Sequence, residues 1–96
     1  MTRGLLIGLV LSFIGCGTVP PVQEMSDARQ AIAAAKEAGA DQDAIEDLQA
    51  AQTYLESAQR KLSERAYAQA KRDALEAKAR AHTALAITEA TDRDPR

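Results

Sequence analysis

The sequence predicts an all-α fold, a small three-helix antiparallel bundle or helical hairpin at residues 22–91, behind an N-terminal signal segment. Alanine, the best helix former, supplies 21 of the 96 residues, and Gln, Glu, Lys, Arg and Leu rank close behind it. Between Val22 and Ala90 there is no proline and only one glycine, Gly39. No window alternates polar and apolar residues as a half-buried strand would.

The first residues of the chain are typical of a secretory signal. Arg3 is the only charged residue before Glu24, and it precedes an apolar run from Leu5 to Ile14. That run is about half of the roughly 20 residues that a membrane-spanning helix needs. We therefore expect residues 1–15 to be a cleaved signal peptide.

The apolar run ends in Phe13-Ile14-Gly15-Cys16, which resembles a bacterial lipobox of the usual form Leu-Ala-Gly-Cys. The resemblance implies cleavage between Gly15 and Cys16, a diacylglyceryl group on the Cys16 thiol and acylation of the new amino terminus. The alternative is an inert buried thiol. Enterobacteria retain lipoproteins in the inner membrane when Asp follows the cysteine. Because Gly17 follows it here, we expect the inner leaflet of the outer membrane, facing the periplasm.

Residues 16–21, which include two prolines, are expected to be a short tether. Fully extended, the segment from Cys16 to Pro21 reaches about 20 Å, so the helices would sit close to the membrane surface. The first helix is expected over residues 22–38. Pro21 fits its first turn because proline has no amide hydrogen to lose there, and Gly39 fits the left-handed position beyond its end.

The second helix is expected over residues 43–62. Asp43 and Glu46 have the spacing of a capping box at the start of a helix. Apolar residues then recur at alternating steps of three and four, as in a seam that faces another helix. The seam comprises Ile45, Leu48, Ala51, Leu55, Ala58 and Leu62.

A third helix is expected over residues 66–91, after a tight turn at residues 63–65. Nothing in that segment breaks a helix, so the second and third helices could also run on as one rod. We favour the turn, because a single seam of that length would need a partner chain. Residues 92–96 are expected to be a polar tail. One face of the third helix consists mostly of methyl groups, which allow close packing: Tyr67, Ala70, Ala74, Ala77, Ala81 and Leu85.

Five segments of the helical region occur in a recognisable order: residues 27–40 (DARQAIAAAKEAGA), 44–48 (AIEDL), 55–58 (LESA), 66–70 (AYAQA) and 74–77 (ALEA). In this order, from Glu24 to Ala90, the chain resembles a family of small alanine-rich bacterial lipoproteins described only as a domain of unknown function. The resemblance implies an anchored helical bundle similar to a tetratricopeptide hairpin, and it brings no catalytic residues. Family members usually have proline at the position of Ile45 and a glycine-containing turn near residues 63–65, and this chain has neither.

Apolar residues larger than alanine are few, with only twelve of them in the helical region. Because this makes a thin core, we expect the chain to associate with itself or with another envelope protein. The candidate partner face comprises Tyr54, Tyr67, Lys71, Lys78 and His82. The alternative is that Tyr67 caps the core and that His82 is half-buried surface.

The composition argues against several functional classes. One Cys and one His cannot build a Cys/His metal site or an intrachain disulfide. A net charge of −2 gives no electrostatic reason to bind nucleic acid. His82 is the only base for neutral pH, and no nucleophile stands at a defined spacing from it, so we expect no catalysis, no small-molecule substrate and no cofactor besides the lipid on Cys16. Four acidic residues lack the glycine and oxygen spacing of a calcium loop: Asp41, Asp43, Glu46 and Asp47.

The sequence therefore predicts a membrane-anchored interaction module of the cell envelope: a scaffold, an adaptor or an accessory subunit. The alternative is a self-assembling structural lipoprotein without a dedicated partner.

Overall fold

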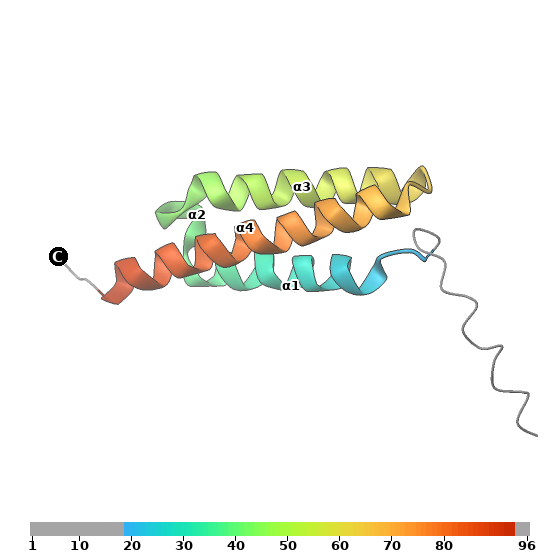
Figure 1. Ribbon diagram of the computed structural model, residues 1–96. Coiled ribbons are helices and arrows are strands. Elements are labelled where there is room, and N and C mark those ends of the chain that lie inside the picture. The colour runs from blue at the N-terminus through green and yellow to red at the C-terminus, as the bar shows by residue number, and fades with distance from the viewer. Residues whose placement is uncertain (1–18, 94–96) are drawn as a thin grey trace, which may run out of the picture.

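A computed structural model describes residues 19–93 of the chain. The expected signal peptide, Cys16 and the first residues of the tether lie outside the described residues, as does the end of the tail at residues 94–96. The fold is all-α, and the three long helices lie side by side as a bundle (Figure 1). The helices are α1 (Val22–Ala38), α2 (Ala40–Asp43), α3 (Ile45–Ser63) and α4 (Tyr67–Arg93).

Ion pairs along α4 show in which direction the helices run. Between α1 and α4, the residue numbers of both partners increase from one ion pair to the next: Glu24–Lys71 and Asp27–Lys78. Between α3 and α4, the residue number on α3 decreases as the one on α4 increases: Lys61–Asp73 and Asp47–Arg80. Thus α1 and α4 run parallel, α3 runs antiparallel to both, and α4 packs along the two others (Figure 1).

The two ends of α1 agree with the prediction. Pro21 immediately precedes the helix, and its carbonyl oxygen accepts a hydrogen bond from the Met25 N–H at 3.1 Å. Gly39 follows the last helical residue with a φ of +104°, in the left-handed region that glycine enters without steric cost. Its N–H donates to the carbonyl oxygen of Lys36 at 3.0 Å, which closes the helix.

The start of α3 differs from the prediction. Residues Ala40–Asp43 form a separate short helix, α2. Ala44 has a non-helical backbone (φ −146°, ψ 51°), which separates α2 from α3, and α3 begins at Ile45. No side chain caps α3, so the predicted capping box is wrong. The reason is that the N–H of Asp43 donates to the carbonyl oxygen of Gly39 at 3.1 Å, which places Asp43 at the end of one helix instead of before the next.

The turn between α3 and α4 lies where the sequence predicts it, and the single rod is excluded. The N–H of Arg65 donates to the carbonyl oxygen of Leu62 at 3.0 Å, and the N–H of Ala66 donates to that of Lys61 at 2.9 Å. This pair of bonds is the Schellman motif, which usually has glycine at its left-handed position. Here Arg65 occupies that position, with a φ of +65°.

Replacing Arg65 by glycine should therefore stabilise the fold. An L-residue pays roughly 1 kcal/mol to adopt the left-handed conformation, whereas glycine pays mainly in the entropy of the unfolded chain. We expect Arg65→Gly to raise the free energy of unfolding by about 0.5 kcal/mol, measured by urea denaturation. Arg72→Gly, inside α4, is the control and should lower it by about 1 kcal/mol. A loss of stability in both variants would contradict the left-handed turn.

The core consists mostly of alanine. The inner face of α4 is buried along Ala70, Ala74, Ala77, Ala81, Ala84 and Thr88. Of the larger apolar side chains among residues 19–93, only Met25, Ile32 and Leu48 are buried, and Leu55, Leu62 and Leu85 pack partly against the core. Ile45, which was expected in the seam, is 40% exposed, because the break at Ala44 makes it the first residue of α3 at the surface. No helix within residues 19–93 combines the length and the apolar character that crossing a bilayer requires.

Candidate functional site

A shallow groove of about 400 Å³, open to solvent, runs between α1 and α4. Its lining includes Lys78 and His82 of α4 and Asp27 of α1. The Lys78 ammonium lies 3.7 Å from the Asp27 carboxylate, and Lys71, two turns earlier on α4, also faces α1. His82 is exposed on the same side of α4. The structure thus brings together three residues of the predicted partner face: Lys71, Lys78 and His82.

Leu75 belongs to the same side of α4, although the predicted face did not include it. Its side chain is 46% exposed. It follows Lys71 by four residues and precedes Lys78 by three, which places all three in one row along the helix. This spacing is readable from the sequence, whereas the position of α1 beside the row is not. We call Lys71, Leu75, Lys78 and His82 the α4 row.

The two tyrosines of the predicted face lie on different helices. Tyr54 lies on α3, where the Arg80 guanidinium is 5.8 Å from the centre of its ring. Arg80 also pairs with Asp47 of α3 at 3.8 Å, so this contact belongs to the α3 side of α4. Tyr67 is half-buried at the first residue of α4. The structure therefore does not bring Tyr54 together with the α4 row.

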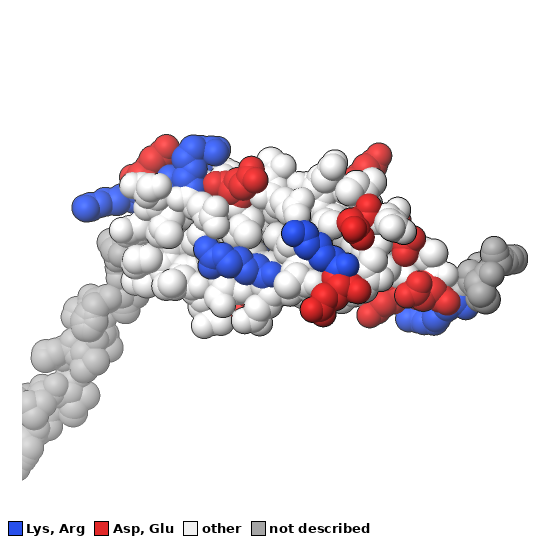
Figure 2. Space-filling model, turned by 180° about the vertical axis from the view of Figure 1, so that it is seen from behind, with Lys and Arg blue, Asp and Glu red and all other residues white. Residues whose placement is uncertain are grey.

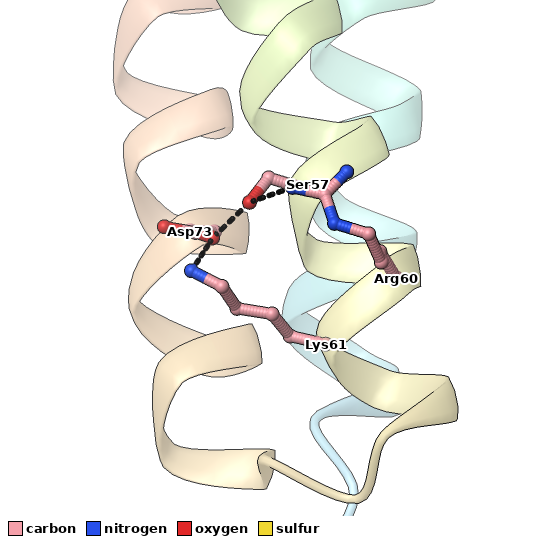
Figure 3. A network of polar contacts seen from close by, with 4 residues as sticks. All are labelled: Ser57, Arg60, Lys61 and Asp73. Carbon is pink, nitrogen blue, oxygen red and sulfur yellow. Dashed lines mark hydrogen bonds and ion pairs between the residues drawn. The ribbon is translucent and has the colours of Figure 1, made fainter.

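A polar network ties α3 to α4 near their shared turn (Figure 3). The Ser57 hydroxyl donates to Oδ2 of Asp73 at 2.6 Å, the Lys61 ammonium donates to the same oxygen at 3.1 Å, and Arg60 donates to Ser57 Oγ at 3.4 Å. Burial raises the pKa of Asp73, but the hydrogen bonds from Ser57 and Lys61 and the charges of Lys61 and Arg72 outweigh it. The pKa of Asp73 therefore lies below its usual value. All four side chains are engaged with one another, which favours a structural role.

Because its pKa is lowered on folding, ionised Asp73 stabilises the bundle above the pKa of an unfolded Asp, about 4, and this stabilisation is lost as the pH falls through the folded value. We expect Asp73→Asn to lower the free energy of unfolding by about 1 kcal/mol at pH 7, because charged hydrogen bonds are replaced by neutral ones. Urea denaturation between pH 7 and pH 3 should show a smaller loss of stability on acidification than in the wild type. Asp41→Asn, at an exposed position, is the control and should leave stability at pH 7 unchanged. An unaltered pH profile in Asp73→Asn would contradict the network.

Three of the four acidic residues near α2 line a second shallow groove. This groove, of about 250 Å³, includes Ile45, Ile87, Asp43, Glu46 and Asp47 in its lining. Among residues 19–93, no three His, Cys, Asp or Glu side chains are grouped so that they could hold a metal ion.

Comparisons with known proteins place the chain in one family. No curated protein and no solved structure gives a significant match. A family model described as a domain of unknown function, DUF4398, matches residues 23–94, which include almost all of the four helices and more than half of the chain. The chain therefore belongs to the DUF4398 family.

Proposed function

We propose that this chain is a lipid-anchored helical interaction module of the bacterial cell envelope, acting as a scaffold, an adaptor or an accessory subunit. The proposal rests on how few of its larger apolar side chains the single chain buries. Only three of the twelve in the helical region are buried within the single chain. Four are exposed: Val22, Ile45, Leu75 and Ile87. A partner that covers such side chains removes apolar surface from water, which favours binding. Because the partner binds the folded chain, it also stabilises that chain.

The anchor rests on the lipobox that ends at Cys16. Acyl chains on this residue would hold the bundle on the membrane, and Gly17 favours the inner leaflet of the outer membrane. Because α1 begins at Val22, six residues after Cys16, the start of α1 stays within about 20 Å of the membrane surface. The module then acts near the membrane and faces the periplasm.

The α4 row is the surface that best suits a protein partner. An exposed Leu75 lies between Lys71 and Lys78, which pair with Glu24 and Asp27 of α1, and His82 lies one turn farther on. This pattern fits an amphipathic helix whose apolar side chains cover Leu75 and whose polar side chains meet the ion pairs beside it. The proposal involves no substrate and no cofactor apart from the lipid.

Site-specific crosslinking in living bacteria tests the proposal. A photoreactive amino acid at Leu75 should give a discrete adduct, whereas the same group at Gln49, exposed on α3, should give none. An adduct with another envelope protein supports the adaptor, and an adduct with a second copy alone supports the structural lipoprotein. No adduct at Leu75, or equal adducts at both positions, would contradict the interaction surface.

A further inference from the structure

Charge is distributed unevenly along the bundle. Residues 60–72, around the turn between α3 and α4, contain five basic residues and one acidic residue. Residues 37–47, at the opposite end, contain five acidic residues and no basic one. Figure 2 shows acidic side chains gathered toward the end at which α4 finishes. Glu24 of α1 and Asp73 of α4 pair with Lys71 and Lys61 at the end around the turn, which therefore carries five basic and three acidic residues. The bundle thus has a weakly basic end and an acidic end.

The chain enters the bundle at the basic end. Met25, in the first turn of α1, shares a core cluster with Ala58 of α3 and Ala74 of α4. Figure 1 accordingly shows the start of α1 beside the α3–α4 turn. Val19 and Val22, just before this point, are 70% and 65% exposed. The segment that leads back to Cys16 thus leaves the bundle beside the basic residues.

Three of the basic side chains at this end form no ion pair with a carboxylate of residues 19–93. Arg60, Arg65 and Arg72 are exposed, and no carboxylate of the described residues lies within 4.0 Å of their guanidinium groups. The two lysines of the segment, by contrast, already face carboxylates of α4 and α1. We call these three arginines, together with Val19 and Val22, the basic end.

We propose that the basic end sits on the anionic phospholipid headgroups of the membrane that holds the acyl chains. The inference rests on the proposed function, because the lipid on Cys16 is what brings this end to the membrane. A tether of about 20 Å allows the arginines to come within a Debye length, about 8–10 Å, of the headgroups. Each arginine at an anionic surface shifts the equilibrium about fivefold toward the state in which the basic end contacts the headgroups. Three arginines therefore shift it about a hundredfold.

This seating also sets the orientation of the module. The acidic end around α2 is repelled by the same surface, so the bundle stands with α2 and the end of α4 farthest from the membrane. The α4 row then runs along the side of an upright bundle, where a periplasmic partner reaches it. The exposed valines add apolar contact at the headgroup level.

The experiment uses the full acylated chain, purified from membranes and reconstituted into vesicles. A thiol-reactive fluorophore is attached at Ala68→Cys, near the basic end, or at Ala90→Cys, 22 residues farther along α4 and about 33 Å away. Lipids with a quencher on the headgroup report proximity. With about 30% phosphatidylglycerol, we expect strong quenching at position 68 and little at position 90. In phosphatidylcholine alone, or in about 0.5 M salt, the difference should shrink.

Charge variants show whether the basic end is responsible. Arg60→Gln, Arg65→Gln and Arg72→Gln, combined in one chain, should abolish the dependence of the quenching difference on phosphatidylglycerol. The control combines Arg29→Gln, Lys36→Gln and Arg93→Gln, all exposed and outside residues 60–72, and should retain it.

Three results would overturn the inference. The first is a quenching difference that does not depend on phosphatidylglycerol, and the second is an equal loss in both combined variants. The third is a difference that grows with the protein-to-lipid ratio, because the basic end would then meet the acidic end of another copy. Failure of the anchor is distinguishable, since a chain without acyl groups has the lower mass and does not float with vesicles of either composition.

Discussion

Cys16→Ser should abolish lipid attachment. A hydroxyl replaces the thiol that acts as the nucleophile for the diacylglyceryl group, so neither the thioether nor the later cleavage before position 16 can follow. We expect no incorporation of a labelled fatty acid and a chain that keeps residues 1–15, which mass spectrometry of the purified protein detects. The variant should also be missing from the outer membrane fraction.

Thr18→Ala is the matched control for this experiment. It changes a hydroxyl-bearing residue two positions after Cys16 and leaves the lipobox intact. It should be labelled, cleaved and sorted as the wild type is. A Cys16→Ser chain that still carries the labelled lipid, or that is cleaved at the same bond, would contradict the anchor.

Ala81→Leu should strongly destabilise the bundle. Ala81 is fully buried on the inner face of α4, in the same core cluster as Ile32 of α1 and Leu48 of α3. Three additional carbon atoms there force the helices apart or into strained rotamers, which lowers the free energy of unfolding by about 1–3 kcal/mol. Urea denaturation measures the change.

Ala79→Leu is the matched control, because it makes the same substitution two residues earlier on the exposed face of α4. It should change the free energy of unfolding by no more than about 0.5 kcal/mol. Equal effects at the two positions would show that the alanine face of α4 is not closely packed against its neighbours.

The long helices could be predicted because their signals are local. Alanine-rich composition indicates helix, Gly39 ends α1 in the left-handed conformation, and the methyl face of α4 is visible in its spacing. The turn at residues 63–65 was harder, since Arg65 carries no local signal for the left-handed position that it occupies. A turn is favoured over a continuous helix only because one long seam would need a partner chain.

The remaining features depend on tertiary contacts. The sequence suggests a capping box at Asp43, but the backbone after Gly39 turns once more as α2 and places Asp43 inside it. The predicted face groups Tyr54 with His82, but the ion pairs of α4 show that α1 and α3 contact different faces of that helix. Leu75 joins the α4 row only when α1 is seen beside it, since spacing alone does not say which residues are exposed.

The central claim is that a partner covers the α4 row in the cell, and thiol accessibility measures this most directly. Leu75→Cys and the control Gln49→Cys, both at exposed positions, are treated with a maleimide in intact envelopes and again after purification. We predict that Leu75→Cys reacts much more slowly in envelopes than after purification, whereas Gln49→Cys reacts at the same rate in both. Equal rates for Leu75→Cys in envelopes and in the purified chain would contradict the claim.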